Sequence, residues 1–312
     1  MTNRSAPVEF RITTCQTTPM PSARVGRIDI EYEDLGPRDG RPLLLIMGLG
    51  AQMILWEDAL CASLAERGHR VIRFDNRDVG RSTRLADAGM PDMALAASAY
   101  FAGRPVQAPY TLSDMAADAA GLLDALGIAS AHVVGASLGG MIAQTLAIER
   151  PQRVRSLTSI MSSTGRPGLP PATPEAMAVL LTPTPAERDA YVERSVHVFR
   201  TIGSPGFPFD ADGVRRLARL SWERGISPDG PARQLLAVIA SGSRHERLAG
   251  VNVPTLVFHG AADPLMPVEH ARDTAGCVPH AELVVVDGMG HDLPHPVWPR
   301  LVDAITRLTS RS

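Results

Sequence analysis

Short apolar runs alternate with segments of helical periodicity along this chain of 312 residues, and this alternation constrains its fold more than any other feature. A run that is apolar at nearly every position is typical of a strand covered on both faces. Strands that alternate with helices predict an α/β fold, with a mostly parallel central sheet flanked by helices and right-handed crossovers. The expected strands are residues 23–27, 28–34, 42–47, 70–74, 131–134, 154–161, 255–258 and 281–286, and the expected helices are 56–67, 111–126, 139–148, 186–199, 212–224, 268–274 and 299–308.

The alternation is interrupted after the sixth expected strand. Residues 163–175 (STGRPGLPPATPE) are dense in Pro and Gly, which mark a turn region, and helical segments follow. An interruption that continues to residue 248 is too long to be a structureless loop in a compact domain. We therefore expect a poorly ordered lead-in at residues 1–21, a core at 22–162, a helical cap at 163–248, and the second part of the core at 249–312.

Composition excludes several classes of function. The formal net charge is −2 and no long Lys/Arg run is present, so neither nucleic acid nor a membrane is expected as a partner. Three cysteines, without a CxxC pair or a Cys/His cluster along the sequence, predict neither a disulfide framework nor a metal site. No apolar run could span a bilayer, and residues 1–20 lack the apolar segment of a signal peptide, which predicts a cytoplasmic protein.

The strongest chemical signal is Gly135-Ala136-Ser137-Leu138-Gly139, between an expected strand and an expected helix. A sharp strand-to-helix turn holds its serine in a strained backbone conformation, so the residues two positions away on each side must be small. The turn directs the hydroxyl out of the sheet and toward a helix N-terminus, where backbone N–H groups point outward. This context favours a nucleophilic Ser137 over a phosphate-binding or merely tight turn.

A serine hydroxyl needs a base, and the base needs an acid that orients it. His291 follows the last expected strand between glycines, which lets the loop present its imidazole at the carboxyl end of the sheet. Asp263 follows the preceding strand, and it is favoured over Asp292 and Asp287 as the acid. His259 lies in or at the end of a strand and is interpreted as a packing residue. Ser137, Asp263 and His291 are therefore the predicted catalytic triad.

The oxyanion of a tetrahedral intermediate needs two hydrogen-bond donors. The N–H group of Leu138, directly after the nucleophile, is the first candidate. The second comes from Met47-Gly48-Leu49-Gly50, where the glycines permit close backbone approach and the N–H group of Leu49 is the expected donor. The alternative is that these glycines only form a turn.

Together these residues resemble the α/β-hydrolase superfamily, over about residues 22–312. The order Ser137, Asp263, His291 is that of its triad, and residues 75–83 (DNRDVGRST) are similar to its loop after the fourth strand. That loop is interpreted as architectural. One departure is Met47-Gly48, where the family often has His-Gly. This variant, with the DNRDVGRST stretch, is similar to the branch that contains aclacinomycin methylesterase, and the resemblance implies an ester substrate.

The favoured function is hydrolysis of a small-molecule carboxylic ester through an acyl-enzyme, without a metal or organic cofactor. The same triad could serve acyl transfer, amide or carbon–carbon bond hydrolysis, or perhydrolysis, and the fold could also serve a non-catalytic receptor. Apolar residues of the expected cap favour short to medium acyl or aromatic esters. They are Phe199, Phe207, Phe209 and Trp222, with Met141 behind the nucleophile, and none is assigned to binding because such residues are more often core. The sequence does not indicate an oligomeric state.

Overall fold

The computed structural model describes residues 21–311, so nearly all of the expected lead-in at residues 1–21 lies outside the described part. Its centre is an eight-stranded sheet with the order β1-β2-β4-β3-β5-β6-β7-β8. The strands from β4 to β8 in this order are parallel, while β2 is antiparallel to both β4 and β1. This confirms the predicted mostly parallel sheet. The strands are β1 Ser22–Val25, β2 Ile28–Leu35, β3 Arg41–Ile46, β4 His69–Phe74, β5 Ala131–Ala136, β6 Val154–Ile160, β7 Thr255–Gly260 and β8 Glu282–Val286.

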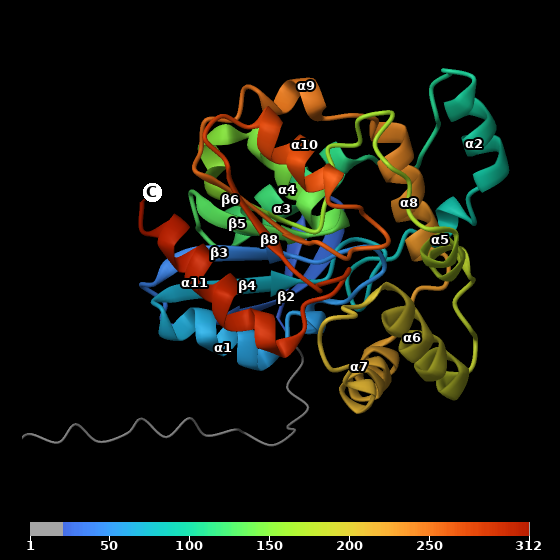
Figure 1. Cartoon of the computed structure of the whole chain (residues 1–312), viewed down its shortest axis with the longest axis horizontal. Coiled ribbons are helices and arrows are strands. Elements are labelled where there is room, and N and C mark those ends of the chain that lie inside the picture. The colour runs from blue at the N-terminus through green and yellow to red at the C-terminus, as the bar shows by residue number, and fades with distance from the viewer. Residues whose placement is uncertain (1–20, 312) are drawn as a thin grey trace, which may run out of the picture.

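Helices cover both faces of this sheet (Figure 1). Successive side chains of a strand point to opposite faces, which explains the continuous apolar run in β3. Leu44 and Ile46 pack into the core beneath α3 and α4, whereas Leu43 and Leu45 pack into the core beneath α1 and α11. The helices are α1 Asp58–Glu66, α2 Met93–Phe101, α3 Leu112–Ala125, α4 Leu138–Glu149, α5 Pro174–Leu181, α6 Arg188–Ile202, α7 Ala211–Arg224, α8 Gly230–Ser241, α9 His245–Leu248, α10 Glu269–Cys277 and α11 Trp298–Thr309.

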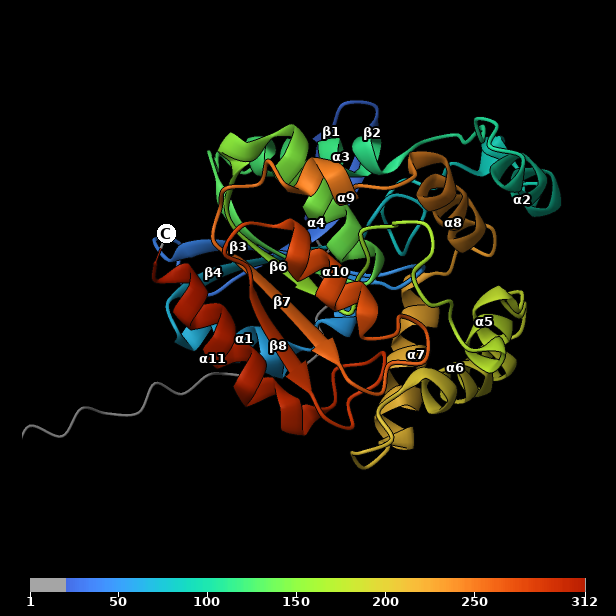
Figure 2. The same cartoon turned by 45° about the horizontal axis from the view of Figure 1, so that its top comes forward.

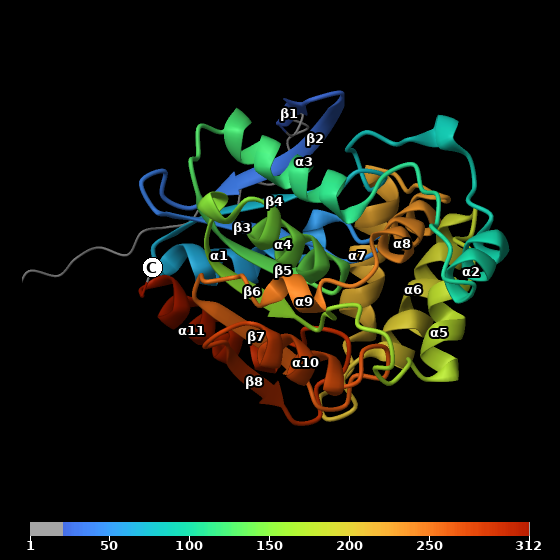
Figure 3. The same ribbon diagram turned by 90° about the horizontal axis from the view of Figure 1, so that it is seen from above.

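Five helices, α5 to α9, come between β6 and β7 in the sequence. Helices α5, α6 and α7 lie at the end of the sheet toward which the parallel strands point, while α9 packs beside α10 (Figures 2 and 3). The predicted turn region at 163–175 ends where α5 begins. Thr173 caps this helix by accepting a hydrogen bond from the backbone N–H of Ala176, and Pro174 occupies the first helical turn. Helices α2, α5, α8 and α9 were not predicted. No described helix is long and apolar enough to cross a membrane.

Side chains of the DNRDVGRST loop, residues 75–83, hold the inserted helices against the core. Asp75 accepts hydrogen bonds from the backbone N–H groups of Met53 (2.8 Å) and Arg81 (3.1 Å), and it pairs with Arg224 of α7 (2.6 Å). Gly80 has φ +55°, and a Cβ there would overlap the Asp75 carboxylate. Only glycine allows the chain to turn this closely around the buried carboxylate.

A second carboxylate of the same loop holds α8. Asp78 accepts two hydrogen bonds from Arg233, at 2.9 and 2.7 Å, and a third from the Tyr110 hydroxyl at 2.8 Å. The Arg233 and Asp78 side chains are 1% and 0% exposed. A buried charge is tolerated only when it is paired and hydrogen-bonded, so this loop is architectural and its Asp residues pair with arginines of the insertion.

Candidate active site

Parallel strands bring their carboxyl ends to one edge of the sheet, and the predicted site residues follow those ends. The register pairs Ile46 of β3 with Gly135 of β5, and Gly260 of β7 with Val286 of β8. The segments that follow these strands contain Leu49, Ser137, Asp263 and His291. The sheet therefore brings together residues that are up to 242 positions apart, counted from Leu49 to His291.

Ser137 lies at the turn between β5 and α4, with φ 55° and ψ −119°. This is a left-handed conformation that costs a non-glycine residue about 1–3 kcal/mol. The flanking glycines are sterically required: a Cβ on Gly135 would overlap the carbonyl of Gly139, and a Cβ on Gly139 would overlap the carbonyl of Ile46. The backbone N–H of Ser137 donates to the carbonyl of Ile160 at 2.9 Å, which ties the turn to β6.

His291 Nε2 lies 3.0 Å from Ser137 Oγ, and His291 Nδ1 lies 2.7 Å from Asp263 Oδ2. With Asp263 ionised, Nδ1 carries the proton and donates it, so Nε2 is left as an acceptor facing the serine hydroxyl. The backbone N–H of His291 donates to the carbonyl of Ile202 at 2.7 Å, and a Cβ on Gly290 would overlap the carbonyl of Gly203. The histidine loop is thus held against the C-terminus of α6.

Asp263 is fixed by its own turn. Its Oδ1 accepts hydrogen bonds from the backbone N–H groups of Leu265 (2.9 Å) and Met266 (2.8 Å), which leaves Oδ2 for His291. His259 is fully buried beside it and forms a hydrogen bond through Nε2 to the carbonyl of Met266 at 2.7 Å. Burial lowers the pKa of His259, so this imidazole stays neutral. His259 therefore packs behind the acid and does not face the cavity.

The two alternative acids lie elsewhere. The Asp292 carboxylate accepts a hydrogen bond from the Ser204 hydroxyl, and burial raises its pKa. Asp287 is exposed after β8. Asp263 is thus the carboxylate that the structure places on His291 Nδ1. Ser204 also accepts a hydrogen bond from the backbone N–H of Gly290 at 2.9 Å, so this residue of the insertion supports the histidine loop. No motif in the sequence indicated it.

The loop after β3 passes beside the nucleophile. A Cβ on Gly48 would lie 3.2 Å from Ser137 Cβ and 3.8 Å from Ser137 Oγ. Within the described residues, the N–H of Leu49 has no backbone acceptor, whereas the N–H of Gly50 donates to Gln234 Oε1 at 2.8 Å. Leu138 opens α4, and the first N–H groups of a helix have no intrahelical acceptor. Both amides are therefore free to meet a ligand oxygen.

Two side chains that the sequence did not single out hold this loop. Asn76 Nδ2 donates to the carbonyl of Met47 at 2.9 Å, and Gln234 of α8 donates from Nε2 to the carbonyl of Arg77 at 2.9 Å while accepting from Gly50. Asn76 belongs to the DNRDVGRST stretch, which resembles a loop of the family. This position is the sequence feature that could have indicated its role. Gln234 contacts the loop only through tertiary packing.

A cavity of about 590 Å³ contains Ser137 and His291 in its lining. This volume lies within the usual range of about 300–1,000 Å³ for small-molecule sites. Its wall combines the core and the inserted helices, and most side chains are apolar. Apolar lining residues include Met47, Leu49, Met161, Leu180, Val198, Phe199, Ile202, Phe209, Val214, Leu217, Leu265, Leu293 and Trp298. Water is thereby partly excluded from the serine, which strengthens electrostatic interactions there.

The aromatic candidates of the insertion divide into two groups. Phe199 and Phe209 line the cavity. Phe207 packs against the core beneath α11, and the Trp222 ring lies 5.7 Å from that of Tyr191. Met141 is buried in the core with α4. Helical spacing could not separate these cases. Phe207 and Phe209 lie between α6 and α7, and the direction of the faces that carry Phe199 and Trp222 depends on how these two helices pack.

Comparisons with known proteins agree with this geometry. The alpha/beta hydrolase fold family matches residues 41–295. The chain is 34% identical over 292 residues to Rhodomycin D methylesterase DnrP of Streptomyces peucetius, covering 88% of this chain and 92% of that protein. It is 31% identical over 276 residues to the putative carbamate hydrolase RutD of Azorhizobium caulinodans, covering 87% and 91%.

Among solved structures, a meta-cleavage product hydrolase of Pseudomonas fluorescens IP01 superposes with a TM-score of 0.70 at 22% identity, covering 93% of this chain and 97% of that one. At this identity the likeness shows the fold alone. The family match spans most of the chain, and the methylesterase similarity extends over nearly its whole length. The chain therefore belongs to the α/β-hydrolase fold family, and its relatives include methylesterases.

Proposed function

We propose that this chain hydrolyses carboxylic esters, with Ser137, His291 and Asp263 as its catalytic triad. The observation that carries the proposal is the continuous hydrogen-bonded series Asp263–His291–Ser137, at 2.7 and 3.0 Å, in the wall of a largely apolar cavity. The methylesterase relatives support an ester as the bond that is cleaved.

The reaction proceeds in two halves. Ser137 Oγ attacks the ester carbonyl while His291 Nε2 accepts its proton, and Asp263 stabilises the imidazolium. The N–H groups of Leu49 and Leu138 stabilise the oxyanion, and loss of one such donor typically costs about 3–4 kcal/mol of transition-state stabilisation. The intermediate collapses, and His291 returns the proton to the departing alcohol. Water then attacks the acyl-enzyme with the same base, which releases the acid and restores the serine.

We further propose a methyl ester of a bulky, largely apolar acid as the substrate class. The cavity of about 590 Å³ is larger than a short acyl chain requires. Two relatives, at 33–34% identity, are by name methylesterases of rhodomycin D, which supports a methyl ester as the bond that is cleaved. Residues 163–248 would act as the cap that selects this acid, since Phe199, Phe209 and Leu217 of that segment line the cavity.

A substrate panel tests both parts of the proposal. Wild-type protein and Ser137→Ala are compared on p-nitrophenyl acetate, p-nitrophenyl butyrate, methyl anthracenecarboxylate and the corresponding amide and carbamate. We expect turnover of the esters by the wild type, loss of turnover in Ser137→Ala, and labelling of Ser137 by a fluorophosphonate. Labelling without ester turnover would instead favour amide, carbamate or carbon–carbon bond cleavage, or acyl transfer. Ester turnover that survives in Ser137→Ala would overturn the assignment of the nucleophile.

A further inference from the structure

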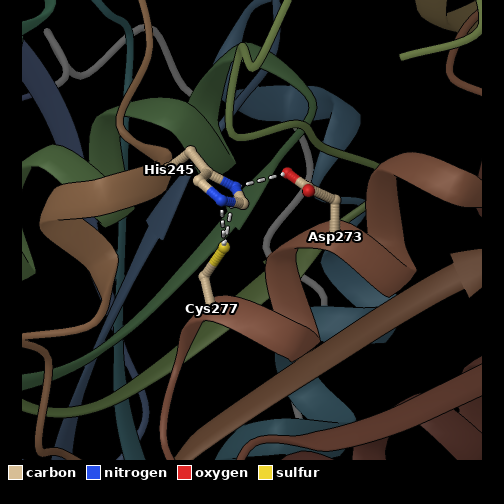
Figure 4. A group of neighbouring side chains, drawn as sticks. All are labelled: His245, Asp273 and Cys277. Atoms are coloured by element: carbon tan, nitrogen blue, oxygen red, sulfur yellow. Dashed lines mark hydrogen bonds and ion pairs between the residues drawn. The ribbon is translucent and has the colours of Figure 1, made fainter. Parts of the chain in front are cut away.

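A second cluster of reactive side chains lies where α9 meets α10. His245 opens α9, while Asp273 and Cys277 lie four residues apart on α10 and so share one face of that helix. His245 Nδ1 lies 3.2 Å from Asp273 Oδ2 and 3.0 Å from Cys277 Sγ. Figure 4 shows the carboxylate and the sulfur pointing toward the same imidazole from two directions. None of these residues lines the cavity that contains Ser137.

The spacing of the three donors suits one metal ion. Zinc bonds of about 2.3 Å to sulfur and 2.0–2.2 Å to nitrogen and oxygen place neighbouring donors of a tetrahedral site roughly 3.3–3.6 Å apart. The donor atoms of His245, Asp273 and Cys277 all lie within 4.8 Å of one another. The separations of His245 Nδ1 from Asp273 Oδ2 and from Cys277 Sγ need to widen by only a few tenths of an ångström, which side-chain rotation provides.

The contacts around Asp273 orient it for this role. Its Oδ2 accepts a hydrogen bond from Thr164 Oγ1 at 2.6 Å, and its Oδ1 pairs with Arg166 Nε at 2.6 Å. The side chain is 4% exposed. Metal-binding carboxylates are commonly held by such outer hydrogen bonds, which fix their direction. Arg166 occupies Oδ1, so Oδ2 remains the oxygen directed toward His245 and Cys277.

The cluster opens onto a surface hollow of about 550 Å³, lined also by Leu169, Pro170 and Gly276. This hollow leaves room for water as a fourth ligand and gives an ion a path from solvent.

We propose that His245, Asp273 and Cys277 form a binding site for a zinc-class divalent cation, with water in the fourth position. Thiolate and imidazole donors select zinc or its analogues cobalt and cadmium over magnesium and calcium, which prefer all-oxygen sites. On binding, the thiol proton passes to solvent and the thiolate ligates the ion. The ion links α9, at the end of the insertion, to α10 of the core. Because the site lies outside the catalytic cavity, the ion takes no part in ester cleavage.

This site was not expected from the sequence, which predicted no metal. The donors are separated by 28 and 4 positions, counted from His245 to Asp273 and from Asp273 to Cys277, and only the packing of α9 on α10 joins them. The proposal is independent of the proposed ester hydrolysis, and it is tested without an activity assay.

The experiment titrates the chelator-treated, reduced chain of 312 residues with Zn²⁺ by calorimetry and with Co²⁺ by visible absorption. We expect one equivalent of Zn²⁺ to bind, and Co²⁺ to give a tetrahedral spectrum with a thiolate charge-transfer band. Cys277→Ser should lose that band, and His245→Gln should lose stoichiometric binding. Thr164→Val, which removes the outer hydrogen bond to Asp273, should weaken binding about 10–100-fold.

Cys61→Ser and His197→Gln are the matched controls, because Cys61 is buried away from the cluster and His197 is exposed on α6. Both should bind like the wild type. Circular dichroism before titration establishes that every variant is folded. The proposal is overturned if the wild type shows no saturable binding of one equivalent, or if Cys277→Ser and His245→Gln bind as tightly as the wild type. Loss of binding in His197→Gln would likewise overturn it.

Discussion

Replacing Asp263 by Asn tests the orientation of the imidazole directly. Asp263 Oδ1 accepts from the backbone N–H groups of Leu265 and Met266, and an Asn side-chain oxygen can keep both hydrogen bonds. The Asn amide would then direct its N–H₂ group at His291 Nδ1, where Asp263 Oδ2 now lies at 2.7 Å. A donor at that position requires Nδ1 to be an acceptor, so the imidazole proton moves to Nε2, which faces Ser137 Oγ at 3.0 Å.

The size of the expected loss in kcat follows from this change of tautomer. An imidazole that carries its proton on Nε2 cannot accept the serine proton, and this defect lowers kcat by about 10⁴-fold in serine hydrolases. The loss equals about 5–6 kcal/mol of transition-state stabilisation. The fold should be preserved, because two of the three hydrogen bonds to residue 263 remain. KM should change little, since Asp263 is buried behind the imidazole.

Steady-state kinetics with p-nitrophenyl butyrate measure kcat and KM for the wild type, Asp263→Asn and two comparison variants. Asp287→Asn changes an exposed carboxylate near the same histidine, and Asp292→Asn changes a carboxylate that binds Ser204. We expect both variants to keep kcat within about tenfold of the wild type, because neither carboxylate belongs to the hydrogen-bonded series Asp263–His291–Ser137. The reasoning is refuted if Asp263→Asn retains more than a tenth of the wild-type kcat, or if Asp292→Asn falls as far.

Three further predictions concern packing and pH. Arg233→Met leaves the buried Asp78 carboxylate without its ion pair and should lower the free energy of unfolding by about 3–5 kcal/mol, whereas Arg215→Met, in an exposed pair, should leave the denaturant midpoint unchanged. Gly139→Ala forces a Cβ onto a carbonyl of β3; it should destabilise the protein by about 1–3 kcal/mol in thermal unfolding and slow fluorophosphonate labelling. Burial raises the pKa of Asp292, so its ionisation opposes folding as pH rises above about 4. The stability of Asp292→Asn relative to the wild type should therefore increase with pH in urea titrations between acid and neutral pH, and a decrease would contradict this account.

Much of the fold could be predicted because its signals are local. The apolar run of β3 is explained by two cores, with Leu43 and Leu45 on one face and Leu44 and Ile46 on the other. A capping box of Thr111 and Asp114 starts α3, where the sequence predicted a helix over residues 111–126. Helix α8 was not predicted, and the Asp229 side chain at its start makes no capping hydrogen bond. Its orientation depends on the Arg233–Asp78 pair, which is a tertiary contact.

The site shows the same division. The sequence indicated Ser137 through its flanking glycines, because a strand-to-helix turn is a local structure with a local steric requirement. The roles of Asn76, Ser204 and Gln234 around the site could not be predicted, since each acts through a hydrogen bond to a distant segment. Periodicity describes which side of an element is apolar, and it does not describe which other element that side will meet.

The amino-acid sequence by itself therefore determined the strand–helix alternation and the turn at Ser137, because each depends on neighbours within a few positions. Only the tertiary structure decided which insertion residues line the cavity, which carboxylates pair with Arg224 and Arg233, and that His245, Asp273 and Cys277 converge. The physical reason is that these contacts arise when packed helices bring distant side chains within a few ångströms, and no local pattern encodes how two helices pack.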